Sequence, residues 1–108
     1  MTLGDVAHSR SGDKGVLVNC SVIAYHQRDY QFLELVVTSE RVKAHLTGLI
    51  HGDVVRYLLP GLGAMNFVMS RPPGDSVTRT LALDPHGKSI SSALLEMVLP
   101  DRMEEQGR

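Results

Sequence analysis

A chain of 108 residues, with 11 basic and 12 acidic side chains, has room for one domain and has no net field that would draw it to nucleic acid or to an anionic membrane. Its one cysteine, Cys20, excludes a disulfide framework, and no stretch resembles a secretory signal or a membrane span. We therefore expect a cytoplasmic domain that binds neither nucleic acid nor membrane.

The N-terminal quarter predicts a short strand over residues 3–9, a sharp turn over residues 10–15 and a central strand over residues 16–24. The turn carries the most distinctive chemistry, through Arg10, Ser11, Gly12, Asp13, Lys14 and Gly15. Because glycine adopts positive φ without steric cost, successive N–H groups of such a turn can form a nest for a phosphate or carboxylate, aided by Arg10 and Lys14. The alternative is a surface hairpin whose polar residues face water.

Two helical segments are expected next. Apolar residues recur at helical spacing over 29–37, and Thr38 or Ser39 can cap a second segment over 39–49. Arg41 and His45 lie four residues apart and so share a helix face. A neutral His45 imidazole can accept a proton, which makes it the candidate catalytic base. The alternative is an exposed polar helix face.

The second half of the chain returns to strands. Gly52 and Asp53 are expected to break the helical pattern before a strand over 54–59. A second strand over 64–69 should place Met65, Phe67 and Met69 on one face. The turn between these strands consists of Pro60, Gly61, Leu62 and Gly63. Further elements are a strand over 78–83, a helix from a cap at Ser89 to Pro100 that buries Val98, and a frayed polar tail over 101–108.

This order of elements predicts an α+β fold with one mostly antiparallel sheet and helices on one face. The uncovered face or the edges of such a sheet invite pairing with another chain, so we expect a dimer or another oligomer.

Two asparagines stand out because each lies in the middle of an apolar predicted strand. A buried amide without partners costs about 1–3 kcal/mol, so Asn19 and Asn66 either fix neighbouring backbone or face a pocket and hold a ligand. The five histidines show no zinc-motif spacing, and we expect neither a metal nor a cofactor.

Several of these segments, in this order, resemble the ferredoxin-fold domain at the C-terminus of AtuA-like proteins, the acyclic terpene utilisation family. They are residues 10–15 with Asn19, residues 40–45, residues 59–67, and Leu83-Asp84 with Gly87-Lys88. The resemblance runs from about Gly4 to Leu95 and implies a single ferredoxin-like domain over residues 1–100. Val16 departs from the family pattern, which commonly has an acidic residue after the second glycine.

Members of that family usually carry a much larger N-terminal domain, in a pathway that degrades branched terpenoid acids as acyl-CoA thioesters. The resemblance thus implies a small accessory subunit of a larger AtuA-like catalytic polypeptide, for a hydratase-type or lyase-type step on a CoA thioester. The turn at residues 10–15, with Asn19, Arg41 and Asn66, would hold an anionic group, and His45 would carry a proton. The alternatives are a homodimeric binding module for a small anionic metabolite and an independent enzyme using His45 or His8.

Overall fold

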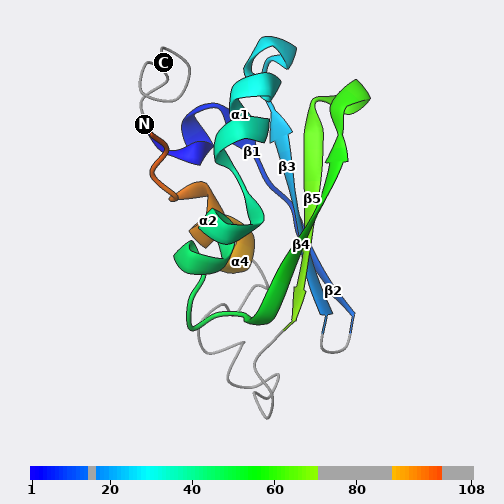
Figure 1. Ribbon diagram of the computed structural model, residues 1–108, viewed down its shortest axis with the longest axis vertical. Coiled ribbons are helices and arrows are strands. Elements are labelled where there is room, and N and C mark those ends of the chain that lie inside the picture. Colours follow the sequence, from blue (N-terminus) through cyan, green and yellow to red (C-terminus); the bar gives the residue numbers. More distant parts are fainter. Residues whose placement is uncertain (15–16, 71–88, 101–108) are drawn as a thin grey trace.

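The computed structural model describes residues 1–14, 17–70 and 89–100, and in this part an antiparallel sheet carries short helices on one face (Figure 1). The strands are β1 (Ala7–His8), β2 (Ser11–Lys14), β3 (Leu17–Ala24), β4 (His51–Leu59) and β5 (Ala64–Ser70). The helices are α1 (Tyr30–Val36), α2 (Ser39–His45) and α4 (Ser89–Leu95), with 3-10 turns η1 (Leu3–Asp5), η2 (Gln27–Asp29) and η3 (Pro60–Leu62). The strand order is β1-β3-β5-β4, with β2 also on β3, and the expected α+β fold is confirmed.

The first two strands are halves of one edge strand in a single register on β3. Ala7 pairs with Ala24 and Ser11 pairs with Cys20, so the same alternation continues through the gap. In that gap the Ser21 N–H donates to the Arg10 oxygen at 2.8 Å, and the Ser21 hydroxyl accepts from the Arg10 N–H at 3.1 Å. The expectation of a turn starting at Arg10 is wrong, because Ser11–Lys14 continues the ladder until Lys14 pairs with Leu17. Gly15 lies outside the described residues.

Alternation along the two central strands builds the core. Val18, Cys20 and Val22 of β3 point to the helices and are buried, as are the β5 residues predicted to share one face, Met65, Phe67 and Met69. The helices contribute Phe32, Leu33, Val36, Val42, Leu46 and Leu94 to the same core. The buried row predicted on the second half of the chain is therefore confirmed.

Helix α2 begins as the sequence predicts, because the Thr38 hydroxyl accepts from the N–H of Arg41 at 3.2 Å. It ends at His45, before the predicted end at residue 49. The Thr47 hydroxyl donates to the Ala44 carbonyl at 2.9 Å, and Gly48 adopts a φ of 93°, so the backbone leaves the helix at this point.

The start of β4 also differs from the sequence prediction. Gly52 and Asp53 lie inside β4, where a φ of 76° at Gly52 and a register shift between His51 and Val55 let the strand continue through a bulge.

The C-terminal helix ends at Leu95, and Val98 is 74% exposed, because the chain after the helix runs alongside the N-terminus. The Leu3 N–H donates to the Met97 oxygen at 2.8 Å, and Val98 forms a bridge with Thr2. The predicted strand over 78–83 and the tail over 101–108 lie outside the described residues.

Candidate functional site

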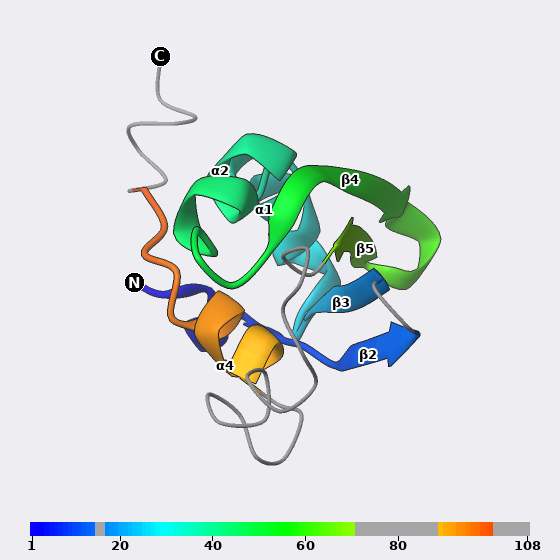
Figure 2. The same cartoon turned by 90° about the horizontal axis from the view of Figure 1, so that it is seen from below.

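A row of polar side chains crosses the face of the sheet that none of the described helices covers, which we call the open face. Register places Arg10 beside Ser21 and Ser21 opposite Asn66, so the row spans three neighbouring strand segments and ends beside Tyr57 of β4, which lies opposite Asn66. Seen from below in Figure 2, α1, α2 and α4 all lie on the other side of the sheet. Two of the predicted site residues, Arg10 and Asn66, thus share one surface.

Asn19 belongs to the same surface, one row further along. It pairs with Gly12 on one side and with Val68 on the other, and its side chain is exposed. A Cβ on Gly12 would lie 3.4 Å from Oδ1 of Asn19, so the amide lies over the glycine. The expectation that Asn19 is buried is wrong, because its position in the alternation of β3 directs it to the open face. Asn66 is half-buried there.

Exposed apolar side chains flank these polar groups. The odd-numbered residues of β3 and of the second half of β4 point to the open face and include Leu17 at 48%, Val55 at 45%, Tyr57 at 55% and Leu59 at 43% exposure. A large set of exposed apolar side chains next to polar groups on an uncovered sheet is typical of a surface that another molecule covers.

The other predicted site residues separate from this surface. The Ser11 hydroxyl lies on the helix side, 3.5 Å from the hydroxyl of Ser91 in α4. Asp13 and Lys14 are placed as strand residues, and their side chains lie outside the described part. The turn residues Pro60, Gly61 and Gly63 belong to η3 and its end, where Gly63 has a left-handed φ of 62°.

Arg41 and His45 are exposed residues of α2, in the helix layer on the far side of the sheet from Asn19 and Asn66. Nε2 of His45 lies 2.6 Å from the main-chain oxygen of Ala93 in α4. Because a carbonyl oxygen only accepts, Nε2 carries the proton and only Nδ1 can take up another. Within one chain, His45 therefore does not share a site with the polar row.

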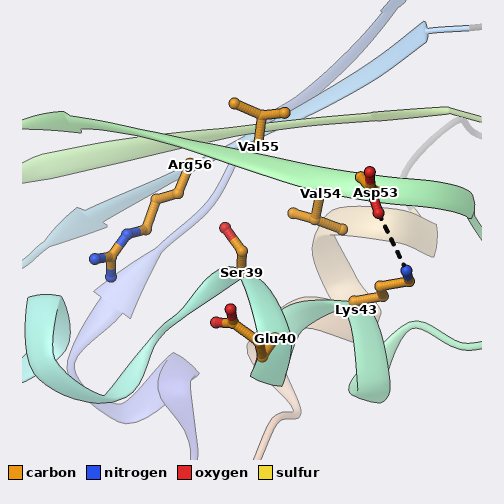
Figure 3. Close-up of a pocket in the computed structure, with 7 residues that line it drawn as sticks. All are labelled: Ser39, Glu40, Lys43, Asp53, Val54, Val55 and Arg56. Carbon is orange, nitrogen blue, oxygen red and sulfur yellow. Dashed lines mark hydrogen bonds and ion pairs between the residues drawn. The ribbon is translucent and has the colours of Figure 1, made fainter.

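A groove of about 520 Å³ lies between α2 and the first half of β4 (Figure 3). It is lined by Ser39, Glu40, Lys43, Asp53, Val54, Val55 and Arg56. Figure 3 shows Arg56 and Val54 on the side of β4 that faces α2, and Val55 on the other side. Lys43 Nζ lies 3.4 Å from Oδ1 of Asp53, at exposures of 52% and 94%, so this pair adds little stability. The charges in the groove are of both signs and favour no single ligand.

Arg56 is a structurally important residue that sequence reasoning missed. Its Nη1 donates to the main-chain oxygens of Glu34, at 2.7 Å, and Val37, at 2.8 Å, and so binds free carbonyls at the end of α1. The signal in the sequence was one arginine in an otherwise apolar strand segment, 54–59. Arg56 also lines a second groove of about 500 Å³ beside α1.

Two buried groups on the helix side are protonated at neutral pH. Burial raises the pKa of the Cys20 thiol to about 12. Burial, followed by the nearby negative charge of Glu34, raises the pKa of Tyr30, whose hydroxyl is buried. Neither group is poised to act as a nucleophile or a base at neutral pH.

In the described ranges no cluster of three or more His, Cys, Asp or Glu side chains is placed to hold a metal ion. The same ranges contain no helix with the length and apolar character that crossing a membrane requires.

Comparison with known proteins gives a family for nearly the whole chain. The model of the AtuA ferredoxin-like domain matches residues 1–100. Neither the curated proteins nor the solved structures gave a match. The resemblance noted in the sequence is thereby confirmed, and the ferredoxin-like α+β sheet agrees with it. This chain belongs to the AtuA ferredoxin-like domain family.

Proposed function

We propose that this chain is the small subunit of an AtuA-like acyl-CoA-processing enzyme of hydratase or lyase type, and that its open face packs on the larger catalytic polypeptide. The observation that carries the proposal is the open face itself. Apolar residues exposed by 43% to 55% on β3 and β4 lie beside a row of polar side chains, and no described element of the chain covers them. The free energy falls when a second protein covers such a surface and removes its apolar side chains from water.

The polar row gives the interface a ligand chemistry. Arg10 supplies a permanent positive charge, and the amides of Asn19 and Asn66 supply donors and acceptors within two rows of it. A carboxylate or phosphate of a CoA thioester at the seam between the two chains would find these groups shielded from water, where charge-assisted hydrogen bonds are strongest.

Acid–base chemistry then falls to the larger chain. His45 and Arg41 lie in the helix layer, and Nε2 of His45 already donates to Ala93. The small subunit therefore binds and orients an anionic group in this proposal, and it does not supply the proton carrier.

The test is acyl-CoA binding by the complex reconstituted with the larger AtuA-like polypeptide of the same organism. Arg10→Ala should weaken binding about 10-fold to 100-fold, the effect of losing one charged hydrogen bond. Arg28→Ala is the matched control, because Arg28 is an exposed arginine of η2 outside the polar row. Equal affinities of the wild-type and Arg10→Ala complexes would contradict the proposed ligand role.

A further inference from the structure

The two edges of the sheet are protected to different degrees. The β1/β2 edge contains an interruption at residues 9–10, and its Ser11 hydroxyl contacts Ser91 of α4. At the opposite edge, β4 is the longest strand, nine residues, and within the described residues it pairs only with β5. A long unpaired edge presents a row of main-chain donors and acceptors that another strand can bind.

The second half of β4 lacks the features that normally block such pairing. Residues 55–59 contain no proline, lysine or glutamate, and four of the five are exposed apolar residues: Val55, Tyr57, Leu58 and Leu59. The one charge, Arg56, is directed to the helix layer, where Nη1 binds the oxygens of Glu34 and Val37. The bulge at 51–55 bends only the first half of the strand.

We propose that β4 pairs antiparallel with β4 of a second copy of this chain, about a two-fold axis at Tyr57. Two residues that lie directly opposite one another in a sheet have their side chains on the same face. A strand that pairs with its own copy must therefore pair odd-numbered residues with odd and even with even, which requires the two-fold axis to pass beside a residue and not between two residues. With the axis at Tyr57, each residue of the segment 55–59 pairs with a residue of the same segment in the second copy. Val55 then faces Leu59 of the second copy, and the two Tyr57 side chains lie side by side.

Charge and chemistry favour a second copy over an unrelated strand. This register sets apolar against apolar at every open-face position of the segment, and cross-strand aromatic pairs are among the more favourable ones. The net charge of −1 gives two copies little long-range repulsion. One self-complementary patch closes a dimer in which the β4 edges of both copies are paired.

The dimer goes beyond the proposed function and does not depend on it. Pairing about this axis joins the two sheets edge to edge and leaves both open faces on the same side. The larger polypeptide can therefore still reach Arg10, Asn19 and Asn66, and the two interfaces can be tested separately.

A cysteine on the axis tests the register. In Tyr57→Cys the two introduced residues would be direct partners with Cα atoms about 4.5–5.5 Å apart, within disulfide range. In Val55→Cys the two cysteines would be about 13 Å apart, since they are offset by four residues along the strands. The native Cys20 is fully buried and does not compete. Oxidation should cross-link Tyr57→Cys and leave Val55→Cys uncross-linked; equal cross-linking of both would overturn the register.

Mass as a function of concentration tests the dimer itself. Wild type should have twice the 11.8 kDa chain mass by light scattering. Leu58→Lys, at a residue only 60% buried, places a lysine opposite Arg56 of the second copy and should weaken the dimer at least 10-fold. Leu17→Lys adds the same charge to the open face of β3, away from the edge, and should leave the dimer intact. A wild-type chain that stays monomeric at every concentration would overturn the proposal, whether hydrogen exchange finds its β4 amides unprotected or protected by other residues of the same chain.

Discussion

Nε2 of His45 in α2 donates a 2.6 Å hydrogen bond to the main-chain oxygen of Ala93 in α4. The bond joins two residues that are 48 positions apart in the sequence, and the Ala93 oxygen also accepts from the N–H of Glu96 at 3.1 Å. In the structure, His45 thus links α2 to α4, whereas the sequence suggested it as a catalytic base.

Removing this hydrogen bond should destabilise the fold and leave ligand binding unchanged. His45→Ala should lower the free energy of unfolding by about 0.5–1.5 kcal/mol, the usual effect of one hydrogen bond. Urea denaturation measures it, with His26→Ala as the control because His26 is exposed and makes no capping hydrogen bond to η2. If His45→Ala instead abolishes turnover in the reconstituted complex at unchanged stability, His45 is catalytic.

Gly63 tests the turn between β4 and β5. Its φ of 62° is left-handed, and a Cβ there would lie 2.7 Å from Oε1 of Gln27, whose amide nitrogen donates to Pro60. Gly63→Ala should cost about 1–3 kcal/mol through backbone strain and displacement of Gln27. Gly61→Ala in the same turn meets no atom within 4 Å, and should change the thermal midpoint little. Equal midpoints for the two variants would contradict this account of the turn.

Arg56 should contribute more stability than an exposed arginine. Replacing it with leucine removes two hydrogen bonds to the end of α1, at 2.7 and 2.8 Å, and should cost about 2–3 kcal/mol. Arg56→Lys keeps the charge but loses the planar fork, so it should fall between wild type and Arg56→Leu. Chemical denaturation of the three proteins gives the order; a lysine variant as stable as wild type would show that charge alone suffices.

The raised pKa of Cys20, about 12 against an ordinary 9.0, makes stability depend on pH. Above pH 9 the unfolded chain loses the thiol proton while the folded chain keeps it. The free energy of unfolding should therefore fall, by up to about 1.4 kcal/mol per pH unit, while below pH 9 the contribution is fully present. Cys20→Ala should lack this part of the slope. The comparison is of slopes between pH 8 and 10.5, and parallel slopes would contradict the buried neutral thiol.

The sequence predicted the buried faces well because alternation and helical spacing are local. Met65, Phe67 and Met69 are buried as expected, and Thr38, one of the two expected cap residues, caps α2. Neither fact requires knowledge of which strands are neighbours.

The grouping of site residues could not be predicted, because it depends on the faces of elements that meet only in the fold. Asn19 was expected to be buried in an apolar run, but the helices cover only one face of that central strand. Arg41 and His45 share α2 as the spacing required, yet the sheet separates them from Arg10 and Asn66. The role of Arg56 depends on carbonyls at the end of a helix 19 to 22 residues away in sequence.

The central claim is that the open face binds a larger AtuA-like polypeptide. The most direct measurement is native mass spectrometry of the tagged chain purified gently from its own cells, beside Leu17→Lys, with the large component identified by peptide sequencing. The account predicts a stoichiometric AtuA-like partner with the wild-type chain and its loss with Leu17→Lys, which charges the open face and leaves the β4 edge unchanged. Recovery of the wild-type chain without any such partner, alone or as a homo-oligomer, would contradict it.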